Sequence, residues 1–189
     1  LAAKRRVQET INLLLIEDNP SDAQFIQEIL AEAESASFKL IWAERLEEAL
    51  KQIKSKKIDL ILLDLSLTEC DGLETLRQVC KVASKLPIIV LTGMADEEMG
   101  LKAIQVGAQD YLLKNRLDAY HLVRSIRMVI KQHQMLQEIK AQAWGLQKVN
   151  EGIRLLYKDL KKKNEELERL DQLKLDFVST ISHELRTPL

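Results

Sequence analysis

Residues 60–64 read Leu-Ile-Leu-Leu-Asp, a run of four aliphatic side chains that ends in a carboxylate. A strand with one face in water alternates apolar and polar residues, whereas a strand buried on both faces is apolar throughout. The run therefore predicts a strand inside a parallel sheet with helices on both faces. Its last residue, Asp64, would lie at the carboxyl end of the strand, where open α/β sheets place their binding sites.

Four similar apolar runs surround this stretch, and segments with helical spacing separate them. The five predicted strands are Ile11–Ile16, Phe38–Trp42, Ile58–Leu63, Leu86–Leu91 and Asp110–Leu113. The predicted helices cover about residues 22–34, 44–55, 72–83 and 95–106. Strands that alternate with helices in this way indicate an α/β fold built on a parallel sheet.

Polar side chains stand at the ends of four predicted strands. They are Glu17 and Asp18 after the first strand, Asp64 at the third, Thr92 at the fourth and Lys114 at the fifth. Converging carboxylates repel one another unless a cation lies between them, and hard oxygen ligands in a small site favour Mg²⁺. A lysine supplies a fixed positive charge, and a threonine hydroxyl donates to a phosphoryl oxygen. The set predicts phosphoryl transfer to a carboxylate, with Asp64 as the nucleophile.

A different pattern begins at about Leu117, after which no proline occurs before Pro188. Sixteen positions follow one alternating four-three spacing, and twelve of them are apolar. The apolar positions are Met128, Met135, Ile139, Leu146, Val149, Ile153, Leu156, Leu160, Leu167, Leu170, Phe177 and Ile181, and the polar ones are Gln132, Gln142, Lys163 and Lys174. This spacing predicts a coiled coil, and hence a homodimer through the C-terminal helix.

Two glycines and one alternative arrangement bear on this helix. Gly145 and Gly152 each cost up to about 1 kcal/mol in a helix interior, so a break there is one possibility. The other is a single amphipathic helix folded back on its own domain.

Composition excludes several classes of protein. With 28 Lys+Arg against 29 Asp+Glu the net charge is −1, which argues against a nucleic-acid-binding protein. The longest uncharged stretch, Leu86–Ala95, is far shorter than the roughly 20 residues of a membrane span. Residues Leu1–Arg6 lack the apolar segment of a signal peptide. Cys70 and Cys80 lack CxxC spacing and predict free thiols in a cytoplasmic protein.

The first half resembles the receiver domain of two-component response regulators. The phrases that carry the resemblance are LLLIEDN at Leu13–Asn19, LLDL at Leu62–Leu65 and GAQDYLLK at Gly107–Lys114. The resemblance covers about residues 10–130. It implies a flavodoxin-like, doubly wound five-stranded parallel sheet of order 2-1-3-4-5, followed here by the long α-helical coiled coil.

The resemblance also implies a metal site and a phosphoacceptor. By it, Asp64 accepts a phosphoryl group from a histidine kinase. Glu17 and Asp18 hold Mg²⁺ together with Asp64, directly or through water, and the carbonyl oxygen of Ser66 completes the protein ligands.

Three further residues take roles by the same resemblance. Thr92 and Lys114 contact the phosphoryl oxygens. Tyr111 is the aromatic residue that turns inward when Thr92 is drawn toward the phosphoryl group.

Two positions depart from the usual receiver pattern. Asn115 follows Lys114 where a proline in a cis bond is common, and a cis non-proline bond costs about 3 kcal/mol, so we expect a differently shaped loop. Thr68 stands where a proline is common. Neither change removes a charged group, so the chemistry is expected to survive. The alternatives are an inactive pseudo-receiver that acts as a dimer scaffold, and a phosphatase of another α/β class, which would usually carry an aspartate where Ser66 stands.

Residues 177–189 read FVSTISHELRTPL and resemble the H-box of histidine kinases. By this resemblance His183 is the autophosphorylation site, Glu184 is its base, and Thr187 assists the dephosphorylation of a receiver aspartate. Ile181 occupies an inward position of the repeat, which directs His183 toward solvent, as a phosphoacceptor imidazole requires.

These features together predict the front part of a hybrid histidine kinase. The expected parts are an N-terminal extension at 1–9, a receiver at 10–130, a coiled-coil signalling helix at 131–172 and a truncated dimerisation and phosphotransfer helix at 173–189. Phosphorylation of Asp64 is expected to regulate the kinase through the coiled coil. The alternative is a receiver that acts as a phosphate sink or relay for His183 of the same dimer. Without an ATP-binding domain, this stretch is not expected to phosphorylate His183 from ATP by itself.

Overall fold

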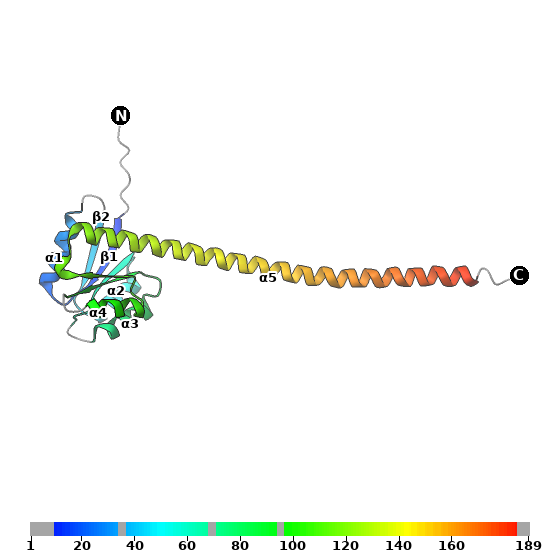
Figure 1. Cartoon of the computed structure of the whole chain (residues 1–189), viewed down its shortest axis with the longest axis horizontal. Helices are drawn as coiled ribbons and strands as arrows, with labels where there is room; N and C mark the ends of the chain where they lie inside the picture. Colours follow the sequence, from blue (N-terminus) through cyan, green and yellow to red (C-terminus); the bar gives the residue numbers. More distant parts are fainter. Residues whose placement is uncertain (1–9, 34–36, 68–70, 94–96, 185–189) are drawn as a thin grey trace, which may run out of the picture. The chain divides into compact units, whose positions relative to one another are not determined.

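The structure is a computed structural model that describes residues 10–33, 37–67, 71–93 and 97–184. The chain divides into two compact units, Leu1–Met135 and Leu136–Leu189. Its elements, labelled in Figure 1, are β1 (Thr10–Ile16), α1 (Pro20–Ala31), β2 (Ser37–Ala43), α2 (Leu46–Ser55), β3 (Leu60–Asp64), α3 (Gly72–Val82), β4 (Ile88–Thr92), α4 (Glu97–Val106), β5 (Asp110–Leu113), the 3₁₀ turn η1 (Lys114–Arg116) and α5 (Ala119–Glu184). The predicted extension at 1–9, Thr68, Cys70 and Thr187 lie outside the described residues.

The five strands form one parallel sheet in the order β2-β1-β3-β4-β5. This order confirms the predicted doubly wound, flavodoxin-like fold. Every residue of β3 and β4 is buried, as the apolar run at 60–64 predicts for a strand covered on both faces.

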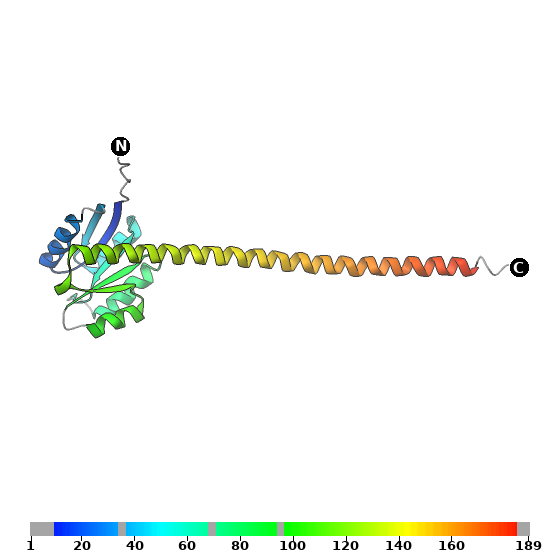
Figure 2. The same cartoon turned by 45° about the horizontal axis from the view of Figure 1, so that its top comes forward.

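Helices cover the two faces of the sheet and create two apolar cores. One core packs α2, α3 and α4 against the sheet through residues such as Leu46, Leu76 and Ala103. The other packs α1 and the first turns of α5 against the opposite face through Ile26, Leu122 and others. In Figures 1 and 2 the three helices α2, α3 and α4 lie on the same side of the sheet. Both cores leave the carboxyl ends of β1, β3 and β4 free to carry polar side chains.

The first helix begins two residues earlier than the spacing predicted, and it ends at Ala31. Pro20 occupies its first turn, where a missing amide hydrogen costs nothing. The side chain of Asn19 caps the helix by accepting a hydrogen bond from the Ser21 amide, at 3.0 Å. The turn that follows Glu17 and Asp18 is therefore short and fixed at both ends.

Two strands begin later than predicted. β3 starts at Leu60 rather than Ile58, and β4 starts at Ile88 rather than Leu86. Leu86 instead closes the turn after α3, because its amide donates to the carbonyl oxygen of Ala83. Pro87 then separates this turn from β4 and has no amide hydrogen to donate.

α5 runs from Ala119 to Glu184 without interruption, and Figure 2 shows it as one ribbon. The helix therefore continues through Gly145 and Gly152, where a break was considered. Among the described residues no peptide bond is cis, so the bond between Lys114 and Asn115 is trans. None of the described helices combines the length and the apolar character that crossing a bilayer requires.

Candidate functional site

Three acidic side chains meet at the carboxyl end of the sheet. Glu17 and Asp18 follow β1, and Asp64 ends the neighbouring strand β3. Each offers one carboxylate oxygen to a cluster whose atoms all lie within 4.8 Å of one another. Glu17 is fully buried and Asp64 is 1% exposed, so two of the three carboxylates lie beyond direct stabilisation by bulk water.

One ammonium group faces the cluster. Nζ of Lys114, in the turn after β5, lies 2.7 Å from Oε2 of Glu17 and 3.0 Å from Oδ2 of Asp64. It also lies 2.7 Å from Oδ2 of Asp22, in the first turn of α1. The positive charge of Lys114 is thus shared by three carboxylates, which outnumber it.

The pKa values of this pair reflect burial and proximity. Burial raises the pKa of Glu17 to about 7, and the nearby charge of Asp64 adds to the rise, while the hydrogen bond from Lys114 opposes it. For Lys114, burial alone would lower the pKa, but hydrogen bonds to Asp22 and Glu17 and the charge of Asp64 outweigh it. The pKa of Lys114 therefore lies above its ordinary value, and the group stays protonated.

The donor set of the cluster fits a small divalent cation. Carboxylate oxygens are the ligands that Mg²⁺ prefers, at about 2.1 Å, so two oxygens bound to one ion lie at most about 4.2 Å apart. One carboxylate oxygen each of Glu17, Asp18 and Asp64 lies within 4.8 Å of the others, close to this limit. The negative charge of these carboxylates attracts the cation.

The carboxylate of Asp64 is held in place by backbone groups beyond β3. The Ser66 amide donates to Oδ1 of Asp64 at 3.1 Å. The Leu65 amide donates to the carbonyl oxygen of Leu91 at 3.2 Å, which extends the pairing with β4 beyond the strand. Ser66 itself is exposed. These bonds leave the second oxygen of Asp64 facing Lys114 and the acidic cluster.

Thr92 ends β4, directly beside the strand that carries Asp64. Its side chain is 1% exposed, and its hydroxyl oxygen has no hydrogen-bond partner among the described residues. A buried hydroxyl without a partner is unfavourable, so such a group is usually retained for a ligand or a rearrangement.

Tyr111 lies on β5, and its partly buried ring packs on the core beneath α4. The contact with α4 depends on Gly100, because a Cβ atom there would lie only 2.5 Å from Cδ2 of the ring. The structure therefore places the two residues predicted to act as a switch, Thr92 and Tyr111, on adjacent strands.

The second predicted site is described only in part. The backbone of His183 and Glu184 belongs to the last turn of α5, but their side chains and the whole of Thr187 lie outside the described residues.

Sequence reasoning missed three residues that contact the site. Asp22 binds Lys114, the indole N–H of Trp42 donates to the carbonyl oxygen of Glu17 at 2.8 Å, and Gly100 admits the ring of Tyr111. Asp22 had a detectable signal, because the first turn of a helix after β1 lies at the same end of the sheet. The bulky Trp42 at the end of an edge strand was a weaker signal.

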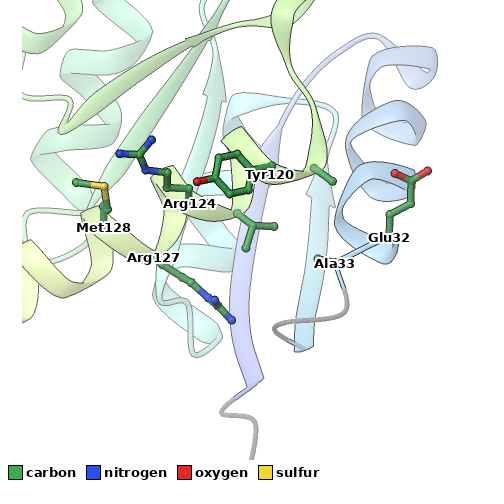
Figure 3. Close-up of a pocket in the computed structure, with 8 residues that line it drawn as sticks. Glu32, Ala33, Tyr120, Arg124, Arg127 and Met128 are labelled. Atoms are coloured by element: carbon green, nitrogen blue, oxygen red, sulfur yellow. The ribbon is translucent and has the colours of Figure 1, made fainter.

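A separate groove lies between the end of α1 and the start of α5, as Figure 3 shows. It has a volume of about 460 Å³, and Glu32, Ala33, Ala119, Tyr120, Val123, Arg124, Arg127 and Met128 line it. None of the predicted site residues lines this groove, and its surface is mostly apolar.

Comparison with known proteins agrees with this geometry. Residues 13–127 match the family described as the response regulator receiver domain. The KDP operon transcriptional regulatory protein KdpE of Escherichia coli is 32% identical over 122 residues, which are 65% of this chain and 52% of KdpE. The cell cycle response regulator CtrA of Brucella ovis is 38% identical over 104 residues, which are 55% of this chain and 44% of CtrA.

The transcriptional regulatory protein ZraR of Salmonella typhimurium is 29% identical over 108 residues, which are 57% of this chain and 24% of ZraR. The chain thus spans between a quarter and about half of the length of these relatives. Among solved structures, a putative response regulator from Chloroflexus aurantiacus is 26% identical with a TM-score of 0.58, covering 65% of this chain and 99% of that one. A receiver domain protein from Clostridium thermocellum is 25% identical with a TM-score of 0.59, covering 67% and 98%.

Proposed function

This chain belongs to the response regulator receiver domain family, and we propose that Asp64 is its Mg²⁺-dependent phosphoacceptor. We further propose that α5 dimerises and carries the state of Asp64 to a histidine kinase region that begins near His183. The observation that carries the first part is the contact of one lysine ammonium with Glu17, Asp22 and Asp64 beside an unpartnered threonine hydroxyl.

The proposed reaction needs little beyond positioning. An oxygen of the Asp64 carboxylate attacks the phosphorus atom of a donor in line with the leaving group; the new P–O bond forms as the old bond to phosphorus breaks, and the leaving group keeps the electron pair. Because the attacking group is already an anion, no proton has to be removed from it. Lys114 is placed to neutralise charge on the transferred oxygens.

The residues that would hold Mg²⁺ are Glu17, Asp18, Asp64 and the carbonyl oxygen of Ser66. When bound, the ion supplies positive charge against the phosphoryl oxygens. Three acidic side chains within 4.8 Å of one another support this assignment.

Thr92 and Tyr111 form the proposed switch. A phosphoryl group on Asp64 would give the Thr92 hydroxyl the partner that it lacks, and the ring of Tyr111 would follow the space that Thr92 vacates. The adjacent positions of Thr92 and Leu113 in the β4–β5 register, two residues from Tyr111, support this coupling.

A second copy of the chain is the proposed partner of α5. Its repeat leaves Leu146, Leu156 and Leu160 between 58% and 72% exposed in the single chain. Leucines at four-three spacing on one helix are the pattern that a two-stranded coiled coil buries. Dimerisation would bring the two copies of the phosphotransfer segment together.

His183, with Glu184 as its base, is the proposed phosphoacceptor of the kinase, and Thr187 would assist the removal of the phosphoryl group from a receiver aspartate. This part rests on the resemblance of residues 177–189 to an H-box and on the helical backbone up to Glu184. The enzyme would then be a protein-histidine kinase whose ATP-binding domain is not among these residues.

The coupling is tested in the complete kinase with Asp64→Asn and Asp64→Glu. We expect each variant to alter the rate of ATP-dependent histidine labelling relative to the wild type, whereas Asp71→Asn, an exposed helix cap outside the cluster, leaves it unchanged. Equal labelling in the wild type and both Asp64 variants would contradict regulation through the receiver.

The direction of phosphoryl flow is read from the same samples. Label on Asp64 that disappears in a His183→Gln variant would identify the receiver as a sink or relay for its own kinase. Label on Asp64 that needs a separate kinase would support the receiver as an input.

A further inference from the structure

We propose that Trp42 is a positioning residue that fixes the backbone between the two acidic residues Glu17 and Asp18 for metal binding. The inference rests on the proposed metal site and adds a residue from the edge strand to it. No described contact joins Trp42 to Asp64 or to Lys114. Its effect would pass through the backbone of Glu17.

Both backbone groups of Glu17 are held by β2. Its amide donates to the carbonyl oxygen of Ala43 at 3.1 Å, which continues the pairing of β1 with β2 by one residue. Its carbonyl oxygen accepts the indole N–H of Trp42 at 2.8 Å. The carbonyl of Glu17 lies beyond the end of β1, where the chain turns toward α1. Its hydrogen-bond donor is therefore the side chain of Trp42 rather than a backbone amide of β2.

The indole also faces a groove that it shares with the start of α1. Trp42, Pro20 and Ala23 line one groove of about 550 Å³ between α1 and β2. Trp42 is 42% exposed, and its N–H donates to the Glu17 carbonyl oxygen. The turn from Glu17 to Pro20 is thereby bounded by β2 on one side and by the capped helix on the other.

This arrangement bears on the metal ligands because the Glu17 carbonyl belongs to the peptide unit that joins Glu17 to Asp18. Rotation about the Cα–C bond of Glu17 would turn this carbonyl away from Trp42 and would also move the Cα of Asp18 and its carboxylate relative to Glu17 and Asp64. The Asn19 amide donates to Oε1 of Glu17 at 3.2 Å, so the Glu17 side chain shares the same turn. Holding the peptide plane in advance removes an ordering cost from metal binding.

The test measures Mg²⁺ affinity by calorimetry in the wild type, Trp42→Phe and Trp42→His. Phenylalanine keeps an aromatic ring but has no donor, whereas Nε2–H of a neutral histidine occupies the same ring position as the indole N–H. We expect Trp42→Phe to raise the Mg²⁺ dissociation constant about fivefold, the factor expected for one ordinary hydrogen bond. Trp42→His should restore the affinity to within about twofold of the wild type.

Trp144→Phe is the matched control, because Trp144 lies on α5 and contacts Lys148 rather than the cluster. In that variant Trp42 is the remaining tryptophan, and its fluorescence should change on addition of Mg²⁺ and saturate with the calorimetric dissociation constant. Urea unfolding of each variant separates a loss of metal affinity from a loss of folding.

Equal Mg²⁺ affinity in the wild type and Trp42→Phe would overturn the inference, as would a histidine variant no better than the phenylalanine variant. Either result leaves the metal site in place. A wild-type protein that fails to bind Mg²⁺ at all would instead refute the metal site, and with it the proposed function.

Discussion

Lys114 carries the ammonium group that contacts Glu17, Asp22 and Asp64, and its side chain is only 20% exposed. Replacing it with methionine would remove this counter-charge from the buried carboxylates of Glu17 and Asp64. Removal of one partner from a buried ion pair costs about 3 kcal/mol. We predict that Lys114→Met lowers the free energy of unfolding by roughly this amount at pH 8, measured by urea denaturation without divalent ions.

The loss of unfolding free energy in Lys114→Met should depend on pH and on Mg²⁺. Burial raises the pKa of Glu17 from 4.5 to about 7, so this group lowers the stability of the folded state progressively as the pH rises from about 4.5 to about 7. Because the hydrogen bond and the charge of Lys114 lower this pKa, Glu17 should stay protonated to higher pH in the variant. The variant is therefore expected to lose less stability at pH 6 than at pH 8. It should recover part of the loss when Mg²⁺ is added. Lys102→Met is the control, because its pair with Glu98 is exposed to solvent and contributes little to stability. Equal losses in the two variants would contradict the assignment.

The hydroxyl group of Thr92 is expected to affect the response to phosphorylation without stabilising the folded state. Its buried hydroxyl has no partner, so Thr92→Val should leave the free energy of unfolding unchanged or raise it by up to about 1 kcal/mol. The same variant should respond less to phosphorylation, because the hydroxyl proposed to bind the phosphoryl group is gone. Thr92→Ser keeps the hydroxyl and is expected to respond like the wild type. A valine variant that unfolds more easily by over 1 kcal/mol would mean that the hydroxyl already has a partner.

At the scale of elements, the contact between α4 and β5 is set by Gly100 and Tyr111. A Cβ at position 100 would lie 2.5 Å from the Tyr111 ring, so Gly100→Ala must displace the ring or the helix. We predict a loss of roughly 1–3 kcal/mol in the free energy of unfolding, the usual cost of overpacking.

A double-mutant cycle with Tyr111→Ala checks this contact. In the Tyr111→Ala background, Gly100→Ala should not lower the free energy of unfolding, because the ring atoms that the new Cβ would meet are absent. Gly145→Ala is the control for helix propensity, since open space surrounds that glycine. Equal effects of Gly100→Ala in both backgrounds would show that the ring is not the obstacle.

The helices and strands also show which features of the structure can be predicted from the sequence alone. The buried strands and the acidic cluster were predictable from the residues, because apolar runs report burial on both faces and parallel strands bring their carboxyl ends together. The strand order was predicted only through the resemblance to receiver domains. The bond from Trp42 to Glu17 joins residues 25 apart, and the bond from Lys114 to Asp22 joins residues 92 apart. The position of Asp22 in the first turn after β1 places it at the correct end of the sheet. The atoms that pair in these two bonds depend on side-chain geometry that exists only after the sheet has formed.

At the scale of the whole molecule, α5 offers a matched pair of leucines. Leu155 and Leu156 are 70% and 72% exposed in the single chain, but only Leu156 falls in the predicted four-three repeat. We predict that Leu156→Asp weakens dimerisation more than tenfold in sedimentation equilibrium, since each buried leucine contributes about 1.5–3 kcal/mol. Leu155→Asp should change the dimer constant little. Equal effects of the two substitutions would contradict the predicted register.

The central claim, that Asp64 is a Mg²⁺-dependent phosphoacceptor, is tested most directly by intact mass after incubation with acetyl phosphate. The wild type and Asp71→Asn should each gain one phosphoryl group with Mg²⁺ and none without it, while Asp64→Asn should gain none under either condition. No addition to the wild type in Mg²⁺ would contradict the claim and favour a dimer scaffold. Equal addition to Asp64→Asn would contradict it by locating the acceptor elsewhere.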